Sequence, residues 1–305
     1  MEKKLSHLGE FGLIELIRKS SALTADVVKG IGDDAAVLNF SGLQRHYYQL
    51  FTTDMLVEDV HFTRKMNARL IGRKALACNI SDVAAMGGIP SSAVVSLAVP
   101  ADLEIRFIED LYRGINHLAK RFGVAIVGGD TVKSEKIVIN IALLGRVKKK
   151  QLVTRAGAGA GDMIFVTGPL GRSFQTGKHL SFTPRIAQSQ FLVNHFKPTA
   201  MIDISDGLCA DLGHILKMSD VGACLYEEKI PKTKNATLQQ ALSDGEDFEL
   251  LFTLSKKQGT ALLQRKSKPF RFYLLGEIMG AKAVLTLMKK DTGRHSIPQK
   301  GFTHF

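Results

Sequence analysis

Residues 30–37 read Gly-Ile-Gly-Asp-Asp-Ala-Ala-Val, so two adjacent carboxylates, Asp33 and Asp34, lie between a glycine turn and a small apolar run. Glycine adopts backbone angles that other residues resist, and residues 35–37 are typical of the start of a buried strand. If the carboxylates lie at a strand end, alternation points them to opposite faces, so that one faces a ligand while the other braces the turn. A surface turn remains the alternative, because Gly-Asp-Asp is common turn chemistry.

The composition is that of a globular protein with a basic surface. The chain has 305 residues, of which 45% are hydrophobic and 23% charged, and this length suits two domains. The net charge of +12 is compatible with a nucleic acid, with anionic metabolites or with a solvated basic surface. Most basic residues are scattered, and the sequence contains neither Trp nor a basic–aromatic ladder of the single-strand-binding kind.

The cysteines and the N-terminal residues indicate a cellular compartment. Cys78, Cys209 and Cys224 have neither the spacing of a metal site nor an even disulfide framework, which predicts buried thiols in a reducing compartment. The first seven residues lack the apolar core of a signal peptide, and no uncharged apolar run approaches the length of a membrane span. We therefore expect a cytoplasmic protein with no membrane partner.

Hydrophobic periodicity predicts an α/β chain. Helices are expected at residues 10–20, 69–86, 103–122 and 256–265, and strands at residues 36–38, 47–53, 92–99, 124–127, 137–143, 163–167, 250–253 and 272–278. The basic cluster at residues 148–150 marks the predicted boundary between an N-terminal domain, residues 1–148, and a C-terminal domain, residues 149–305. The glycine-rich residues 155–162 precede a strand, whereas a Rossmann fingerprint follows one, so that motif is excluded.

Acidic residues recur beside glycine, serine or threonine where the predicted elements end. They are Asp34, Asp54, Asp82, Asp130, Asp203 and Asp206. Hard cations such as Mg²⁺ prefer oxygen ligands, and six carboxylates around one cavity would repel one another unless bound cations neutralised them. The sequence has no zinc-type Cys/His cluster, P-loop or protein-kinase signature. The pattern therefore predicts several Mg²⁺ ions that carry a polyphosphate.

Each candidate also has an ordinary structural alternative. Asp34 and Asp130 can be turn formers, and Asp82 can be a surface acid on a helix. Ser205 or Asp206 is expected to cap a helix whose free N–H groups suit a phosphate, and Asp206 can be that cap alone. His61 can be an ordinary histidine, Arg155 a solvated base and Phe302 an apolar anchor.

Seven segments together resemble the thiamine-monophosphate kinase family, of the superfamily that includes aminoimidazole ribonucleotide synthetase. They are residues 30–35, 52–57, 61–62, 79–87, 128–131, 203–208 and 245–250, and they follow the family's order along nearly the whole chain. The resemblance implies an α/β (α+β), two-domain aminoimidazole ribonucleotide synthetase-like fold. It implies that the N-terminal domain binds ATP and Mg²⁺ and forms a homodimer by pairing sheets, with the active cleft between the two domains.

The resemblance also implies a reaction and a set of site residues. Several Mg²⁺ ions assist the transfer of a phosphoryl group from ATP, the co-substrate, to thiamine monophosphate. The implied metal positions are Asp34, Thr52, Thr53, Asp54, Asp82, Asp130, Asp203 and Asp206. The implied ATP contacts are Gly129, Asp130, Arg155 and Ser205, and the implied substrate contacts are His61, Glu246 and Phe302. No covalent nucleophile is expected, because phosphoryl transfer needs mainly positioning and charge neutralisation.

The chain departs from the family pattern in three places. Asp244 replaces the first of two glycines, and residues 301–304 read Gly-Phe-Thr-His in place of Gly-Tyr-Asp-His. Residues 171–184 form a short connection that is expected to lack a helix. Another superfamily member, such as aminoimidazole ribonucleotide synthetase, and a member that binds ATP without turnover remain alternatives. In a different class, so does a basic nucleic-acid-binding protein.

Overall fold

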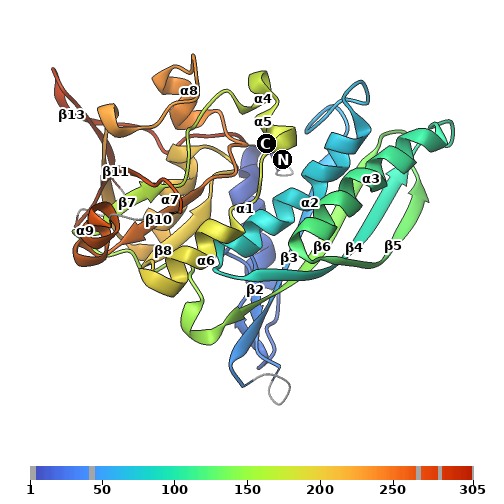
Figure 1. The fold of residues 1–305 in the computed structure, drawn as a ribbon, viewed down its shortest axis with the longest axis horizontal. Coiled ribbons are helices and arrows are strands. Elements are labelled where there is room, and N and C mark those ends of the chain that lie inside the picture. Colours follow the sequence, from blue (N-terminus) through green and yellow to red (C-terminus); the bar gives the residue numbers. More distant parts are fainter. Residues whose placement is uncertain (1–4, 41–44, 266–268, 281–283, 304–305) are drawn as a thin grey trace.

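Two mixed sheets form the framework of the molecule. The computed structural model describes residues 5–40, 45–265, 269–280 and 284–303. Its first sheet has the strand order β1-β2-β3-β6-β4-β5, and its second has the order β13-β12-β9-β11-β7-β10-β8. Figure 1 shows the first sheet in blue to green and the second in yellow-green to red. The predicted α/β class is confirmed.

Long neighbouring strands define the first sheet. Its strands are β1 (Val27–Lys29), β2 (Ala36–Leu38), β3 (Tyr47–Val57), β4 (Ile89–Val99), β5 (Ala125–Lys133) and β6 (Val138–Lys148). All neighbours are antiparallel except β4 and β5, which are parallel. Strand β3 was expected to end at Asp54 and β5 to end before Gly129, but both strands continue past these residues. The reason is that β3 pairs with β6 along its full length, and β5 with β4 as far as Lys133.

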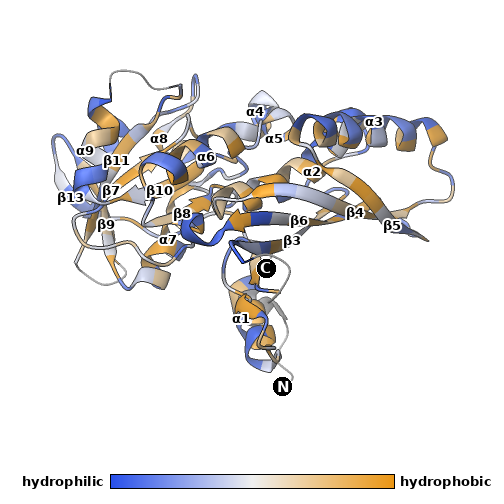
Figure 2. Ribbon diagram, turned by 60° about the horizontal axis from the view of Figure 1, so that its bottom comes forward, coloured by the Kyte–Doolittle hydropathy of each residue, from blue (hydrophilic) through white to orange (hydrophobic). Residues whose placement is uncertain are grey.

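Two helices cover one face of this sheet. They are α2 (Ala68–Ala85) and α3 (Ile105–Phe122), whereas α1 (Leu5–Ser20) projects on the other side (Figure 2). The two covering helices approach closely where each has a glycine. A Cβ atom on Gly72 would lie 2.0 Å from the carbonyl oxygen of Leu111, and one on Gly114 would lie 1.9 Å from that of Arg69. This packing fixes α2 over the centre of the sheet.

The opposite face of the first sheet, called the open face below, has an apolar surface. The exposed side chains there include Phe51, Met55, Val94, Val127 and Val132. Val127 is 65% exposed, although strand residues of this type usually pack against another layer. An exposed apolar patch of this kind is typical of a surface that contacts another protein.

Shorter elements build the second half. Its strands are β7 (Met163–Val166), β8 (Ala200–Asp203), β9 (Gly222–Tyr226), β10 (Leu250–Leu254), β11 (Tyr273–Met279), β12 (Leu285–Lys289) and β13 (Gly293–Ser296). Its α-helices are α4 (Ser173–Thr176), α5 (Lys178–Ser181), α6 (Ile186–His195), α7 (Leu208–Ser219), α8 (Leu238–Ser243) and α9 (Lys256–Gln264). The 3₁₀ turn Lys149–Gln151 joins the halves, and Glu227–Lys229 is a second such turn. The assignment of two domains divided at residues 148–149 stays a prediction.

The connection over residues 171–184 contains helix, contrary to expectation. Helices α4 and α5 are single turns separated by Gly177. The Asp247 carboxylate orders them: Oδ2 accepts from Gly171 N at 2.9 Å, and Oδ1 accepts from Ser173 Oγ at 2.6 Å. The contacts that form these turns come from a distant segment, so local periodicity did not indicate them.

The C-terminal end of α2 lies where the two halves meet. Ala84 and Ala85 pack in one apolar cluster with Val153 and with Phe165 of β7. Ser189 of α6 donates to the Ala84 carbonyl oxygen at 2.6 Å. Side chains from the last turn of α2 therefore lie close to the strand ends of the second sheet.

Two further findings concern the cysteines and possible membrane spans. Cys78, Cys209 and Cys224 are free and buried, as predicted. Within the described ranges, no helix combines the length and the apolar character that crossing a bilayer requires.

Candidate active site

Three carboxylates from distant segments meet where the halves join. Asp34 lies just before β2, Asp82 in the last turn of α2, and Asp203 at the end of β8. One carboxylate oxygen from each lies within 4.8 Å of the other two. We call this group the three-carboxylate cluster. The sequence predicted that these acids converge, and the structure confirms it for these three.

Each carboxylate of the cluster has a donor on one oxygen. Arg155 Nη2 donates to Asp34 Oδ1 at 2.7 Å, and Ser81 Oγ donates to Asp203 Oδ2 at 2.6 Å. Thr52 Oγ1 donates to Asp82 Oδ2 at 2.5 Å. The second oxygen of Asp34 is buried and has no hydrogen-bond partner in the described part of the chain. An orphaned carboxylate oxygen of this kind is what a bound cation would satisfy.

Burial and mutual repulsion disfavour the charged form of the cluster. Burial, opposed by the Arg155 guanidinium and reinforced by the Asp203 charge, raises the pKa of Asp34 to about 7. Burial is also the main cause that raises the pKa of Asp203 to about 6 and holds the pKa of Asp82 well above its usual value. A divalent cation reverses this balance, because it stabilises the ionised carboxylates. The donor set therefore fits Mg²⁺, which prefers oxygen ligands.

Strand β3 adds one more acid beside the cluster. Thr52 and Asp54 pair with the buried Leu143 and Ile141 of β6, so both side chains face α2. Burial, followed by the charge of Asp34, raises the pKa of Asp54 to about 6. Asp54 Oδ2 is also buried without a hydrogen-bond partner among the described residues. Thr53 faces the other way, and its Oγ1 donates to the Ile141 carbonyl oxygen at 3.1 Å.

The adjacent acids in residues 30–37 have separate contacts. Asp34 points into the three-carboxylate cluster, whereas Asp33 Oδ1 accepts from the Arg155 backbone N at 3.1 Å. Lys29 Nζ lies 3.2 Å from Asp33 Oδ2. Asp33 therefore braces the segment that carries Arg155, the partner of Asp34. The two carboxylates have different surroundings, as alternation suggested, and the ligand role of Asp34 stays a prediction.

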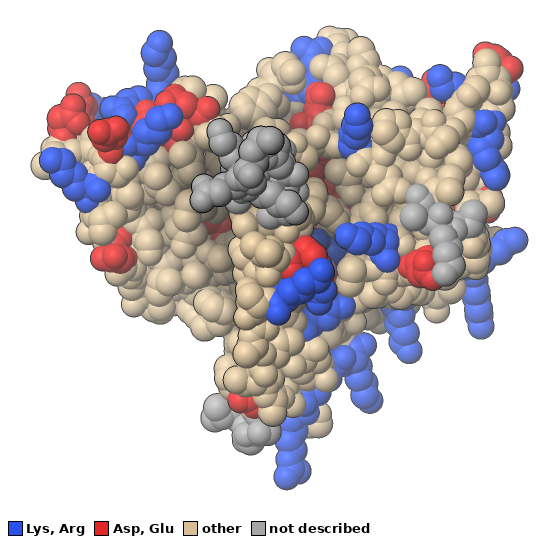
Figure 3. All heavy atoms as spheres, turned by 180° about the vertical axis from the view of Figure 1, so that it is seen from behind, with Lys and Arg blue, Asp and Glu red and all other residues tan. Residues whose placement is uncertain are grey.

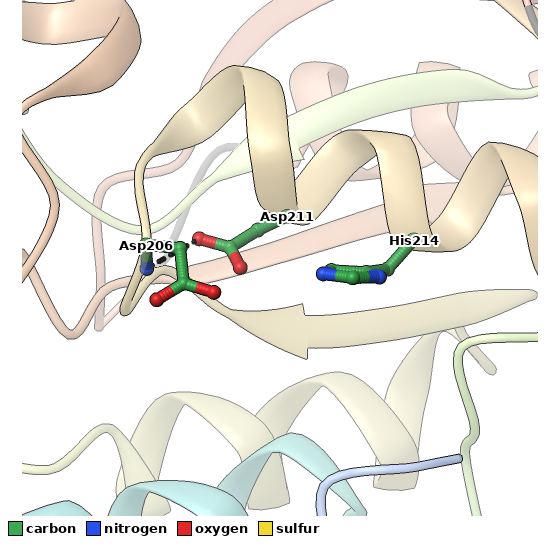
Figure 4. A group of neighbouring side chains, drawn as sticks. All are labelled: Asp206, Asp211 and His214. Atoms are coloured by element: carbon green, nitrogen blue, oxygen red, sulfur yellow. Dashed lines mark hydrogen bonds between the residues drawn. The ribbon is translucent and has the colours of Figure 1, made fainter. Parts of the chain in front are cut away.

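A second group of possible metal ligands lies at the start of α7. Asp206, Asp211 and His214 each have a ligand atom within 4.8 Å of the others, and Figure 4 shows them along one side of the helix. Burial raises the pKa of Asp206 to about 6 and lowers the pKa of His214 to about 4. The imidazole is therefore neutral near pH 7 and has a nitrogen lone pair available for a cation.

The cap of α7 differs from the prediction. Gly207 occupies the N-cap position, and neither Ser205 nor Asp206 caps the helix with its side chain. Asp211 Oδ2 accepts from the backbone N of Asp206 at 3.1 Å and of Gly207 at 3.0 Å. A carboxylate from the first turn of the helix thus replaces the expected cap, and the Asp206 side chain lies beside that of Asp211 (Figure 4).

The three candidate substrate contacts fall into two places. Lys74 Nζ donates to Glu246 Oε1 at 2.5 Å and to the His61 carbonyl oxygen at 3.2 Å, so it joins Glu246 to the His61 segment. Phe302 lies beside the α7 ligands, since its backbone N donates to the Asp206 carbonyl oxygen at 2.9 Å. Glu246 N donates to the Ser205 carbonyl oxygen at 2.6 Å, which connects the two places.

Lys74 was not among the predicted site residues. It is fully buried in α2, and Lys74, Cys78 and Asp82 follow one another at intervals of four, which places them along one helix face. That spacing to a predicted metal ligand was the available signal. The sequence did not show the acid that pairs with Lys74, because Glu246 is 172 residues away.

Gly129 and Asp130 lie away from both groups of ligands. They belong to the edge strand β5, and Asp130 is exposed and pairs with Ser96 of β4. Three strand spacings separate β5 from β3, or about 14 Å at the usual spacing. Asp130 and Thr53 both face the open face, because their register partners alternate with the buried residues. A single chain therefore does not bring Asp130 to the three-carboxylate cluster.

The departure at Asp244 has a local explanation. Asp244 has ordinary helical backbone angles, with φ −65°, so it does not need to be glycine. Its Oδ2 accepts from Arg172 N at 2.8 Å and thereby anchors α4. Thr303 is exposed, and His304 lies outside the described residues.

Known proteins resemble this chain in sequence and in structure. Residues 32–147 match the family model of the AIR synthase related protein, N-terminal domain. The thiamine-monophosphate kinase of Aquifex aeolicus is 34% identical over 99% of this chain and 100% of its own length. That of Bacillus subtilis is 33% identical over 98% of this chain and 100% of its own length. The solved structure of AaThiL complexed with AMPPCP and TMP is 32% identical, with a TM-score of 0.86 and 100% of both chains covered.

Proposed function

The chain belongs to the thiamine-monophosphate kinase family, an ATP-dependent group of enzymes, and we propose that its own substrates are ATP and thiamine monophosphate. The observation that carries this proposal is the three-carboxylate cluster with Arg155, in a chain similar over its full length to the related structure that holds AMPPCP and TMP. The reaction forms thiamine diphosphate and ADP. It joins a phosphate oxygen of the acceptor to the γ-phosphorus of ATP and breaks the bond from that phosphorus to the β–γ bridging oxygen.

Asp34, Asp54, Asp82 and Asp203 would hold Mg²⁺, and Asp206 would extend this site toward α7. Bound there, Mg²⁺ supplies the positive charge that neutralises the phosphate groups. Arg155 has a complementary part, because its Nε is buried and has no hydrogen-bond partner within the described ranges. A guanidinium that already holds Asp34 has N–H groups left to bind phosphate oxygens in a fixed orientation.

Neither a covalent nucleophile nor a general base is needed in this proposal. The acceptor is a phosphate monoester, whose second pKa near 6 leaves its oxygens ionised at neutral pH. The protein then has to align the two substrates in line and balance their charges. His61, Glu246 and Phe302 would hold the acceptor, and Ser205 with Arg155 would hold the nucleotide.

A homodimer would complete the site. The open face carries an apolar surface, and Gly129 and Asp130 lie on that same side of the sheet. If two copies pair through their open faces, each supplies Gly129 and Asp130 to the nucleotide site of the other. This arrangement would bring Asp130 to the open face of the partner's sheet, where Thr53, another implied metal position, also lies.

We also propose a cytoplasmic location without nucleic-acid or membrane partners. The three cysteines are free and buried, which suits a reducing compartment. In Figure 3, lysines and arginines are spread over several parts of the face shown, with acidic side chains between them. Such a distribution favours a solvated basic surface over a continuous track for nucleic acid.

A coupled assay for ADP tests the proposed function. With ATP and Mg²⁺ present, we expect ADP to form only when thiamine monophosphate is added, together with one equivalent of thiamine diphosphate by chromatography. Withholding Mg²⁺ should stop the reaction, and adding it back should restore the reaction. ADP formation that does not respond to thiamine monophosphate would contradict the proposal.

A further inference from the structure

Lys74 is a fully buried lysine in the middle of α2. Lysine is almost never fully buried unless a partner compensates its charge. Its Nζ donates to Glu246 Oε1 at 2.5 Å and to the His61 carbonyl oxygen at 3.2 Å. Lys74 thus binds the two segments that supply the candidate acceptor contacts of the proposed kinase.

Aromatic side chains surround this ion pair. Lys74 Nζ lies 5.8 Å from the centre of the Phe174 ring, and Phe174 stacks on the buried His179 with ring centres 4.2 Å apart. Surroundings of low polarity strengthen a charge pair and make an unpaired polar atom costly. Lys74 is therefore a strong determinant of the orientation of Glu246.

Glu246 is left with one unsatisfied carboxylate oxygen. Its Oε2 is buried and has no hydrogen-bond partner in the described part of the chain, although Oε1 is bound by Lys74. The residue also has a positive φ of 52°, which is unfavourable for any residue other than glycine. Its backbone N donates to the Ser205 carbonyl oxygen at 2.6 Å and holds this conformation. Strain together with an orphaned polar atom is typical of a ligand-binding position.

We propose that Lys74 is a positioning residue, which binds Glu246 through Oε1 so that Oε2 accepts an N–H from the amino group of the acceptor's pyrimidine ring. This inference rests on the proposed function. The Oε2 oxygen can only accept a hydrogen bond, so its partner must donate one. The N–H groups of thiamine monophosphate all belong to that amino group. The thiazolium ring has no N–H, and the phosphate is an acceptor at neutral pH. The Lys74–Glu246 pair therefore selects for the amino group.

The test compares thiamine monophosphate with the analogue in which an oxo group replaces the amino group. Selectivity is measured as the ratio of kcat/KM values, and also as the ratio of Kd values by calorimetry with a non-hydrolysable ATP analogue. We expect Lys74→Met to raise KM for thiamine monophosphate about tenfold and to lower selectivity by about tenfold, as loss of a polar contact does. KM for ATP should change less than KM for thiamine monophosphate, although the charge of Lys74 also acts on Asp54.

A double-mutant cycle separates positioning from general destabilisation. Lys74→Met leaves Glu246 without its cation, so Lys74→Met with Glu246→Gln provides a second background in which residue 246 carries no charge. If Lys74 acts through Glu246, then Lys74→Met should not change selectivity further once Glu246 is Gln. The matched control is Lys178→Met, which removes a lysine that lies 3.2 Å from Asp247 and 3.1 Å from Glu249. We expect it to lower the melting temperature without changing selectivity.

Two outcomes would overturn the inference. One is unchanged selectivity in a folded Lys74→Met protein, and the other is an equal loss of selectivity in Lys178→Met. Failure of the proposed function gives a different result: calorimetry would show selective binding of the amino compound by the unmodified protein, but no thiamine diphosphate would form. No binding of either compound would refute both.

Discussion

Arg155 and Asp34 form an ion pair, 2.7 Å from Nη2 to Oδ1, that joins the segment before β7 to the segment before β2. The same arginine is held through its backbone N by Asp33, the neighbour of its partner. One short stretch of the first half therefore fixes both the main chain and the side chain of a residue from the second half. Because the pair lies beside the three-carboxylate cluster, it sets the distance between the halves at that site.

Asp34→Asn should stop phosphoryl transfer while the fold is retained. The amide keeps the shape but removes a charge that would bind Mg²⁺, and we expect kcat to fall by about 10²–10³-fold, as when a charge-stabilising group is lost. The control is Asp291→Asn, at an exposed position between β12 and β13. Full activity in Asp34→Asn would contradict the proposed metal site.

The metal-free protein should become less stable as the pH rises through neutrality. Burial raises the pKa of Asp34 from 3.8 to about 7, so the folded state holds this proton more tightly than the unfolded chain. The contribution of Asp34 to the free energy of unfolding is complete below the unfolded pKa and is lost as the pH rises through the folded pKa. The pKa of His214 is lowered to about 4, so its contribution to the free energy of unfolding increases with pH. That increase is complete above the unfolded pKa of the histidine.

Melting curves from about pH 6.5 to about pH 8 therefore isolate the carboxylates. In EDTA we expect the melting temperature to fall across this range. Saturating Mg²⁺ should abolish the fall, because the cation stabilises the ionised form, and Asp34→Asn should reduce it. A flat profile in EDTA would show that these carboxylates do not repel one another in the folded protein.

The sequence predicted the fold class and the acidic site residues better than the helices and strands that depend on tertiary contacts. The α/β class and the convergence of Asp34, Asp82 and Asp203 followed from local patterns, and the whole-chain resemblance to the family indicated the enzyme. Strand lengths were predicted less well. Apolar alternation does not extend through the glycines of β5, yet pairing with β4 continues the strand to Lys133. Such pairing is a tertiary effect that local propensity cannot show.

Several missed features depend on partners distant in sequence, whereas the start of α7 depends on a local contact. Helices α4 and α5 form because Asp247 binds their backbone and side chains. Asp211 holds the start of α7 from within the helix, so the expected cap residues were not used. Lys74 became recognisable as a site residue only when Glu246 was found beside it. Strands β1, β9, β12 and β13 were also not predicted.

Mixing two inactive variants tests the homodimer proposal. Asp34→Asn and Asp130→Asn should each be inactive alone. If each copy supplies Asp130 to the other, a mixed dimer contains one intact site, and an equal mixture that exchanges freely should recover about one quarter of the original activity. Native mass spectrometry would check that mixed dimers form. Mixed dimers without any recovery would place Asp130 outside the shared site.

Neighbouring glycines in β5 provide a matched pair for a stability prediction. A Cβ atom on Gly129 would lie 1.9 Å from the Val95 carbonyl oxygen, whereas one on Gly128 would meet only Val94 Cγ1 at 3.8 Å. Gly129→Ala must therefore push β5 away from β4, and we expect it to cost about 1–3 kcal/mol, as overpacking does. Gly128→Ala adds a side chain in ordinary contact and should be close to neutral.

Urea unfolding of both variants, with kcat measured in parallel, tests this difference. The displacement caused by Gly129→Ala should also move Asp130. We therefore expect this variant to lose activity even at a low temperature at which it is fully folded. Gly128→Ala should retain its activity. If Gly129→Ala unfolds at the same urea concentration as the unmodified protein, the strands can separate without cost. That result would contradict the stability prediction.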